Sequence, residues 1–396
     1  MTPIISQIRV CSVDEEGRFG GPERRIVQVA KALKTHGQGV DTQVVYPRDD
    51  SEKFALELSR SGVSSSALNI TRLSKEKKVF VRYLFYFLPE VFRIYSFFRR
   101  GKFDLVQVNG SQQFKGALAA KLAGVPVIWV LEDTMMAAIV KKICTLLVKY
   151  TAAGVIVVGK RVSDYYIRGT FLESKPVVEI HPSVDIAEFN LRQVVSDSKI
   201  SKISGRKIVT VSGINPTKGL EYFIEMASVL LKRYNDLSFY IAAQNLKSQH
   251  RYYQYLMDLA AAFKLTSDNI KFLGMVDDIP ALLQSADIFV FTSISESGPM
   301  AVWEAMAMGK AVVTTDVGSV NQYLVDGESG FIVPIKDSRA LCEKVEILLN
   351  DPALRQEMGA RAQAIAQKKL DVSIAAEKYA HFYRKILLLR KNGNSL

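Results

Sequence analysis

Residues 287–316, DIFVFTSISESGPMAVWEAMAMGKAVVTTD, place two short, β-rich apolar runs on either side of an apolar helical stretch. A Ser-Gly-Pro turn separates the first run from the helical stretch, and proline suits the first position of a helix. Two parallel strands need a crossover between them, which is usually a helix. The stretch therefore predicts a strand at 287–293, a helix at 299–308 and a second, parallel strand at 310–316.

The same alternation of strands and helices continues along the whole chain. Further helices are expected at 23–35, 219–233 and 250–264. The other expected strands are 8–13, 42–47, 105–109, 126–131, 154–159, 207–213, 237–243 and 270–274. Strands that alternate with helices form parallel sheets with helices on both faces. The sequence therefore predicts an α/β protein built from doubly wound parallel sheets.

The length and composition predict two domains. A chain of 396 residues, of which 48% are hydrophobic, can bury two cores of the usual domain size. Residues 191–206 are polar and lack an apolar period, so we take them as the linker between domains 1–190 and 207–375. The C-terminal helix, 376–396, is expected to pack back on the first domain.

The net charge indicates the kind of binding partner, and the cysteines and the start of the chain indicate the cellular compartment. The net charge of +12 calls for an anionic partner, but no nucleic-acid recognition module is visible, so nucleic acid is not expected. The start of the chain lacks the basic and apolar segments of a signal peptide. The three cysteines have no disulfide or metal-ligand spacing. We expect a cytoplasmic protein.

Residues 75–103, KEKKVFVRYLFYFLPEVFRIYSFFRRGKF, combine many aromatic side chains with Lys and Arg at both ends. Their apolar runs are too short to cross a bilayer, and Pro89 predicts a pair of helices broken near that residue. Two interpretations stay open. The aromatic residues either form a core between helix and sheet, or present a basic, aromatic surface to anionic lipid headgroups at the inner face of the membrane.

The turn at 298–301 has the features of an anion site. With Pro299 at the first helical position, the backbone N–H groups of Met300 and Ala301 have no intrahelical partner and lie at the positive end of the helix. Gly298 has no Cβ and lets a ligand come close to the backbone. We expect a phosphate group to bind there.

Two carboxylates flank this turn, Glu296 before it and Glu304 within the helix. The order carboxylate, amide groups, carboxylate matches the order hexose, diphosphate, ribose in a nucleotide diphosphate sugar. The alternative gives Glu296 to a solvated loop and Glu304 to a helix surface. Glu304 lies within AVWEAMAMG, however, where nearly every neighbour is apolar and a carboxylate needs a partner.

Residues 207–365 resemble the donor-binding domain of the retaining glycosyltransferases of family 4 (group 1), which have the GT-B fold. The matching stretches are VSGINPTKGLEYFIEMASVL at 211–230, most of 272–334 with its Glu-x7-Glu element, and NDPALRQEMGARAQ at 350–363. GRFGGPERRIVQVAKAL at 17–33 and FDLVQVNG at 103–110 resemble the N-terminal domain more loosely. The resemblance implies two Rossmann-like domains that face a central cleft, with the acceptor on the first domain and the nucleotide sugar on the second.

The resemblance also implies residue roles. Glu296 would contact the transferred sugar, Glu304 the ribose hydroxyls, and Lys218 the phosphates, although a solvated lysine before a helix is the alternative for Lys218. The implied donor-binding residues are Gly20, Gly21, Gly213, Lys218, Glu296, Ser297, Gly298, Pro299, Met300, Ala301 and Glu304. The implied catalytic residues are Glu296, Lys218 and Glu132.

Three positions depart from the family pattern. Gly213 stands where the family commonly has an arginine near the phosphates. Glu132 and Asp133 stand where it often has a histidine, and either carboxylate could hold an acceptor hydroxyl or its proton, or belong to an ordinary loop. His181, in HPSVD, stands at a strand end on the acceptor side, where a structural histidine is the alternative.

No Asp-x-Asp pair occurs in the sequence, so we expect no metal and no cofactor. The expected donor is a nucleotide diphosphate sugar, with UDP favoured, and the expected acceptor is a glycan or a polyprenyl-linked intermediate of surface-polysaccharide synthesis. From the resemblance, transfer would retain the anomeric configuration without a covalent intermediate. The rival hypothesis is a catalytically silent GT-B scaffold that binds a nucleotide sugar or a partner enzyme.

Overall fold

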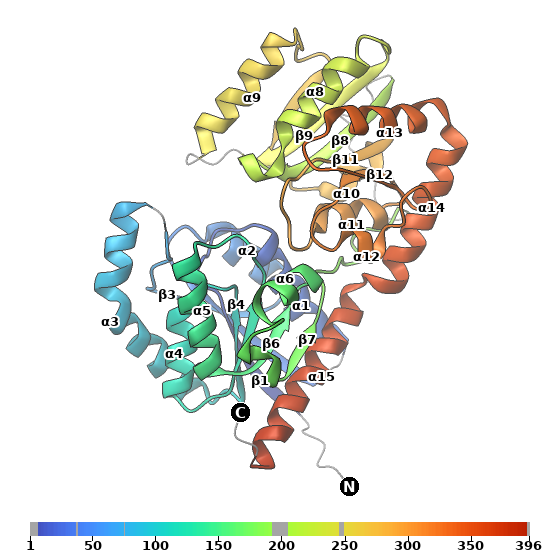
Figure 1. The fold of residues 1–396 in the computed structure, drawn as a ribbon. Helices are drawn as coiled ribbons and strands as arrows, with labels where there is room; N and C mark the ends of the chain where they lie inside the picture. The colour runs from blue at the N-terminus through green and yellow to red at the C-terminus, as the bar shows by residue number, and fades with distance from the viewer. Residues whose placement is uncertain (1–6, 37–38, 75, 192–204, 245–248, 394–396) are drawn as a thin grey trace. The chain divides into compact units, whose positions relative to one another are not determined.

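The computed structural model describes residues 7–36, 39–74, 76–191, 205–244 and 249–393. The chain forms two compact units, the first made of 1–182 with 372–396 and the second of 183–371. Each unit is a parallel sheet with helices on both faces, which confirms the predicted fold class (Figure 1). Most of the predicted linker, 192–204, lies outside the described residues.

The first unit contains a seven-stranded parallel sheet in the order β3-β2-β1-β4-β5-β6-β7. Its strands are β1 Ile8–Val13, β2 Val40–Pro47, β3 Ser64–Leu68, β4 Leu105–Asn109, β5 Val127–Leu131, β6 Ala152–Val157 and β7 Val177–Glu179. The chain winds outward from β1 in one direction through β3 and then, from β4, in the other. This reversal places β1 beside β4, with Val13 opposite Val108.

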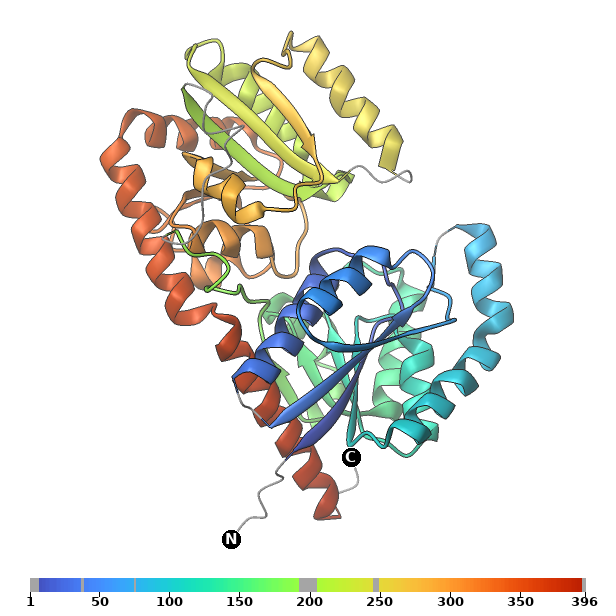
Figure 2. The same cartoon turned by 180° about the vertical axis from the view of Figure 1, so that it is seen from behind.

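The helices of the first unit cover both faces of this sheet (Figures 1 and 2). They are α1 Gly21–Thr35, α2 Glu52–Arg60, α3 Lys77–Gly101, α4 Phe114–Leu122, α5 Ala138–Thr151, α6 Lys160–Tyr166, the short 3-10 helix η1 Phe171–Ser174, and α15 Val372–Lys391. Alternate strand residues point to opposite faces. Gly116 of α4 lies against Val13 and Val108, whereas α1 and α15 lie over Ser12 and Gln107. The last helix of the chain is therefore part of the core of the first unit.

The second unit contains a six-stranded parallel sheet in the order β10-β9-β8-β11-β12-β13. Its strands are β8 Arg206–Gly213, β9 Leu237–Gln244, β10 Ile270–Gly274, β11 Ile288–Phe291, β12 Ala311–Thr315 and β13 Phe331–Val333. Its helices are η2 Pro216–Lys218, α8 Leu220–Leu230, α9 His250–Ala262, α10 Ile279–Ser285, α11 Met300–Ala307, α12 Val320–Tyr323, α13 Ser338–Asn350 and α14 Pro352–Lys369. The β11–α11–β12 unit confirms the prediction from residues 287–316.

Both faces of the second sheet are buried. Ile288 and Val290 of β11 pack into one core, and Phe289 and Phe291 pack into the other. This explains why β11 is a continuous apolar run rather than an alternating one, because a parallel strand between two layers of helices is apolar on both sides.

The segment 75–103 differs from its prediction. It forms the single helix α3, which continues through Pro89 instead of breaking there. Proline removes the hydrogen bond to the carbonyl group four residues earlier, here that of Phe85. Both residues lie on the exposed side of the helix, where water can bind that carbonyl group, so the lost bond leaves no buried polar group. In the described part of the chain, no helix combines the length and the apolarity needed to span a membrane.

Candidate functional site

The carboxyl ends of β8 and β11 form the topological switch point of the second unit. These two strands are neighbours in the sheet, and the chain leaves them in opposite directions. Open parallel sheets bind ligands outside the carboxyl ends of their strands at such a point. Lys218 follows β8 and Glu296 follows β11, so the fold brings two of the predicted site residues to this position.

Lys218 and Glu296 form an ion pair. The Lys218 Nζ lies 2.5 Å from Oε1 of Glu296, and the side chains are 24% and 13% exposed. The Ser293 hydroxyl donates a second hydrogen bond to the same Oε1 at 2.9 Å. Two donors on one oxygen hold the carboxylate in a single orientation. Ser293 was not anticipated from the sequence, because its role depends on the turn that brings it back to Glu296.

The loop after β8 is shaped by local rules. Asn215 Oδ1 accepts the N–H of Thr217 at 3.0 Å and so starts the short helix η2. Gly219 then adopts φ +58°, and a Cβ on it would stand 2.3 Å from the carbonyl oxygen of Thr292. Only glycine allows this approach, which lets the Thr292 hydroxyl bind the Lys218 carbonyl group at 3.0 Å. The loop is therefore fixed against the end of β11.

The start of α11 differs in one respect from the sequence prediction. The helix begins at Met300, with Pro299 as the N-cap residue rather than the first helical residue. The Met300 N–H donates to the carbonyl group of Gly298 at 3.0 Å, so this group is already used. The carbonyl group of Ser297 lies against Gly318, whose φ is +56°. The predicted pair of unpaired N–H groups is therefore wrong for Met300.

Glu304 lies in the buried part of α11. It is 1% exposed, and its neighbours Val302, Trp303 and Ala305 are fully buried. The apolar surroundings predicted for this carboxylate are present. Its contact with a ribose stays a prediction.

Gly213 ends β8 beside the loop that carries Lys218. A Cβ on Gly213 would meet only the Asn215 side chain, at 3.7 Å, which is ordinary van der Waals contact. The Cβ of a longer residue would therefore fit at this position without a clash.

The glycine pair of the first unit opens α1. The N–H of Gly20 donates to Oε2 of Glu23 at 2.7 Å, which caps the helix. A Cβ on Gly21 would meet nothing within 4 Å. The space beside this helix start is open on the Gly21 side.

A cluster of acidic side chains surrounds one arginine next to that helix start. Arg25 Nη2 lies 2.5 Å from Oε1 of Glu132, and the two side chains are 4% and 16% exposed. Burial, and then the negative charges of Glu16 and Glu132, raise the pKa of Asp14 to about 7. Burial and the charge of Asp14 raise the pKa of Glu23 to about 9. At neutral pH the Glu23 carboxyl group therefore holds its proton.

The other predicted acceptor residues have separate partners. Burial, followed by the Glu132 charge, raises the pKa of Asp133 to about 6. His181 Nε2 lies 2.6 Å from Oε1 of Glu179, and burial lowers the pKa of the imidazole against the opposing effect of that carboxylate. His181 is thus paired at the end of β7, while Glu132 is paired with Arg25.

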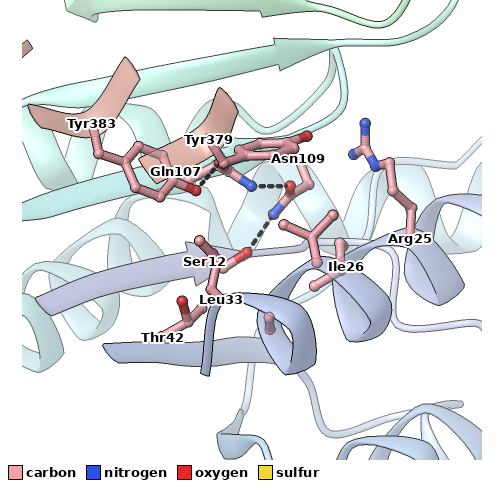
Figure 3. Close-up of a pocket in the computed structure, with 11 residues that line it drawn as sticks. Ser12, Arg25, Ile26, Leu33, Thr42, Gln107, Asn109, Tyr379 and Tyr383 are labelled. Atoms are coloured by element: carbon pink, nitrogen blue, oxygen red, sulfur yellow. Dashed lines mark hydrogen bonds between the residues drawn. The ribbon is translucent and has the colours of Figure 1, made fainter. Parts of the chain in front are cut away.

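A small cavity lies below Arg25, between the sheet and helices α1 and α15 (Figure 3). A chain of hydrogen bonds crosses it from Tyr383 to Gln107 at 2.6 Å, from Gln107 to Asn109 at 2.8 Å, and from Asn109 to Ser12 at 2.8 Å. Its volume of about 10 Å³ suits a single water molecule. The cavity is therefore part of the polar core and has no room for a sugar.

A second ion cluster is fully buried beneath the loop that follows β1. Lys115 of α4 is 0% exposed, and its Nζ lies 2.7 Å from Glu90 of α3 and 3.6 Å from Glu15. The same Nζ donates to the carbonyl group of Thr71. Burial is the main cause of the raised pKa of Glu15. The cluster joins α3 and α4 to the loop that leads to Gly20.

Within the described ranges, no group of three or more His, Cys, Asp or Glu side chains is arranged to hold a metal ion. Metal-independent action stays a prediction.

Two Rossmann-like parallel sheets, with a lysine–carboxylate pair at the switch point of the second, define the GT-B class of protein. Residues 19–188 match the family described as "Glycosyltransferase Family 4", and residues 196–365 match that described as "Glycosyl transferases group 1". The chain belongs to the family 4, group 1 glycosyltransferases.

Relatives and solved structures agree with this assignment. The chain is 28% identical over 244 residues to "Alpha-D-kanosaminyltransferase" of Streptomyces kanamyceticus, covering 59% of the chain and 61% of that protein. It is 34% identical over 123 residues to "N,N'-diacetylbacillosaminyl-diphospho-undecaprenol alpha-1,3-N-acetylgalactosaminyltransferase" of Campylobacter jejuni, covering 31% and 32%. The matches thus span less than two thirds of these relatives. The fold resembles that of Anabaena Alr3699/HepE, solved with UDP and glucose, with a TM-score of 0.81, 21% identity, and coverage of 96% of this chain and 100% of that one.

Proposed function

We propose that the protein is a retaining glycosyltransferase that moves a hexose or N-acetylhexosamine from a nucleotide diphosphate sugar to a hydroxyl group of a glycan or lipid-linked acceptor. The observation that carries the proposal is the Lys218–Glu296 pair at the switch point of the second unit. A lysine neutralises charge that builds on a leaving diphosphate, and fixed charges of this kind are usually the largest catalytic contribution. A carboxylate held by Ser293 can accept the hydroxyl groups of the sugar.

The donor and acceptor classes follow from what the relatives' names say of those proteins. The HepE structure holds UDP and glucose, which supports a UDP-sugar as donor. The name of the Campylobacter relative contains a diphospho-undecaprenol unit, which supports a polyprenyl-linked acceptor. In the proposal Lys218 takes the place of a divalent cation, so transfer needs neither metal nor cofactor.

The proposed roles divide between the units. Glu296 orients the sugar, Lys218 binds the diphosphate, and Glu304 binds the ribose. Gly20 and Gly21 stay proposed contacts of the donor, with open space at the Gly21 Cβ position, while the Gly20 N–H donates to Glu23. Glu132 and Asp133, with His181 nearby in the sheet order, make up the acceptor side. Of the two carboxyl groups Glu132 and Asp133, Asp133 has its pKa raised to about 6, which suits proton exchange near neutral pH.

The test is a thermal-shift screen of the full chain against UDP-, GDP- and ADP-sugars, followed by assay of slow donor hydrolysis. A preferred donor raises the melting temperature by mass action. The wild type should hydrolyse the same donor that stabilises it, and Glu296→Gln should keep the stabilisation but lose most of the hydrolysis. Neither stabilisation nor hydrolysis with any nucleotide sugar would overturn the proposal.

A catalytically silent scaffold is the second candidate. Gly213 in place of an arginine, and the engagement of Glu132 with Arg25, are the observations that favour it. Tight binding of one nucleotide sugar without any hydrolysis, in the presence of candidate acceptors, would decide for the scaffold.

A further inference from the structure

Two helices of the first unit expose stripes of large apolar side chains. On α3 the stripe recurs at three- and four-residue spacing, as it does on α5, so each stripe lies along one side of its helix. Exposure ranges from 47% for Ile143 to 76% for Phe85. The α3–α5 surface, as we call it, consists of Val81, Leu84, Phe85, Leu88, Phe92, Ile139, Ile143, Leu146 and Tyr150. Exposed rows of large apolar side chains such as these mark interaction sites.

The two helices belong to one flank of the first unit. Helix α4 packs against both α3 and α5. It is made largely of small, buried residues such as Gly116, Ala117 and Ala120, and it offers little surface of its own. In Figures 1 and 2, α3 is the outermost helix on its side of this unit. The exposed stripes are therefore available without any rearrangement of the core.

The charges on the two helices have one sign. The exposed charged side chains of α3 are Lys77, Lys78, Arg82, Arg93, Arg99 and Arg100. The helix has one acidic residue, Glu90, which is buried against Lys115. Helix α5 carries Lys141, Lys142 and Lys149 and no acidic residue. Apolar stripes next to cations fit a surface that is both apolar and anionic.

We propose that the α3–α5 surface docks on an anionic lipid bilayer. Large apolar and aromatic side chains, among them Phe85 and Phe92, enter the boundary between headgroups and acyl chains, and the lysines and arginines bind lipid phosphates. The buried face of α3, through Val91, Ile94 and Phe98, keeps the helix on the protein while the opposite side meets the lipid. This inference goes beyond the proposed function and does not depend on it.

The first experiment is flotation of the full chain with vesicles of phosphatidylcholine alone or mixed with phosphatidylglycerol. Binding to the mixed vesicles only is expected, because the cations need a negative surface. It should weaken as salt rises, since exposed charges are screened. Equal recovery with both vesicle types, or recovery with neither, overturns the proposal.

Three sets of variants test the surface itself. The sets are Phe85→Ser with Leu88→Ser and Phe92→Ser, Ile139→Ser with Ile143→Ser and Leu146→Ser, and Lys77→Gln with Lys78→Gln and Arg82→Gln. Each removed charge should weaken vesicle binding about fivefold. Each apolar set should weaken it about tenfold or more. A loss with the α3 set alone, and none with the α5 set, would disprove the two-helix surface.

The matched control is Tyr255→Ser with Met257→Ser on α9, which removes exposed apolar side chains from the second unit. It should bind vesicles as the wild type does. Thermal melting checks that every variant is folded, and the side chains changed are exposed, so folding should be kept. A stable dimer in the absence of lipid that the α3 set dissociates would assign the surface to a second copy of the chain and overturn the proposal.

Discussion

The two sheets present opposite kinds of chemistry at their carboxyl ends. In the second unit, one lysine and one carboxylate lie partly exposed and bind each other. In the first unit, Asp14, Glu23 and Glu132 lie close enough for their charges to interact, Arg25 pairs with Glu132, and burial keeps the pKa values of Asp14 and Glu23 high. The first arrangement suits a ligand that brings its own negative charge. The second suits neutral hydroxyl groups and the protons they exchange.

The difference shows that one topology supports two kinds of site. Both sheets reverse direction at the same place in their order, β1 beside β4 and β8 beside β11. The loops and helix starts beyond the strands, not the sheets, determine which charged groups stand there.

Arg25→Met removes the guanidinium from the acidic cluster and should destabilise the first unit most. The change leaves the buried Glu132 carboxylate without its partner, and breaking one side of a buried pair costs about 3–5 kcal/mol. The measurement is the fall in melting temperature. The matched control is Arg361→Met, whose pair with Glu357 has a similar distance of 2.6 Å but is 50% and 58% exposed. The control should cost less than about 1 kcal/mol. Equal losses of stability in the two variants would show that the Arg25–Glu132 pair stabilises the fold no more than an exposed ion pair does.

Lys218→Ala should lower sugar transfer by about 10²–10³-fold, as the loss of one fixed transition-state charge usually does. The melting temperature should change little, because the side chain is partly exposed. Steady-state kinetics with the preferred donor measure the effect. Lys232→Ala, an exposed lysine beyond α8, is the control and should behave as the wild type. Lys218→Ala activity within a few-fold of wild type would contradict the donor-site assignment.

Glu23→Gln should change the pH dependence of stability. The pKa of Glu23 rises from 4.5 to about 9 on folding, so between these values the folded state holds a proton that the unfolded state releases. Wild-type stability therefore falls as pH rises through this window. Glutamine cannot ionise and still accepts the Gly20 N–H. The variant should therefore be as stable as the wild type near the lower end of this pH window and more stable than the wild type near its upper end.

Melting temperatures of both proteins, measured across that window, test this prediction. The difference, variant minus wild type, should grow with pH. Glu328→Gln, at an exposed site, controls for the loss of one carboxylate. A difference that stays constant or shrinks with rising pH would show that Glu23 is ionised in the folded protein.

Gly213→Arg should have the smallest effect and the opposite sign, tightening donor binding up to about fivefold, as one added ion pair near the surface contributes about 1 kcal/mol. The open space around the Gly213 Cβ position makes the change tolerable. Calorimetric titration with a UDP-sugar measures it, with Gly213→Ala as a control that adds a side chain without charge. If the arginine variant binds the donor more weakly and the alanine variant does not, the added guanidinium lies too far from the donor phosphates to bind them.

The sequence predicted the core of both sheets and missed strands at their edges. Strands such as β11 are apolar on both faces and are therefore visible as continuous runs. The missed strands β3 Ser64–Leu68, β7 Val177–Glu179 and β13 Phe331–Val333 all lie at the edge of a sheet. Edge strands are short or partly polar, since one side meets no neighbouring strand. The pattern that reveals a strand is thus weakest where the sheet ends.

The candidate site was predictable to the extent that it is local. The order of strand, turn and helix at residues 287–308 follows from nearby residues, although the Met300 N–H is used within the turn. The pair of Arg25 with Glu132 joins residues 107 positions apart, and no spacing rule connects them. Similarly, the continuity of α3 through Pro89 depended on which side of the helix faces the solvent, and a single sequence does not give that.

The buried Lys115 cluster makes α3 a fixed part of the first unit rather than a detachable one. Separating α3 from the fold would take Glu90 away from the buried Lys115, leave that lysine with the more distant Glu15 carboxylate, and expose Val91, Ile94 and Phe98, and each of these changes costs free energy. An amphipathic helix that entered the bilayer by itself would have to meet that cost. Helix α3 should instead contact the lipid while it stays packed on the first unit. The same lysine contacts Glu15, in the loop after β1 that also carries Asp14. Docking through α3 would therefore hold the acidic cluster at a fixed distance from the lipid surface.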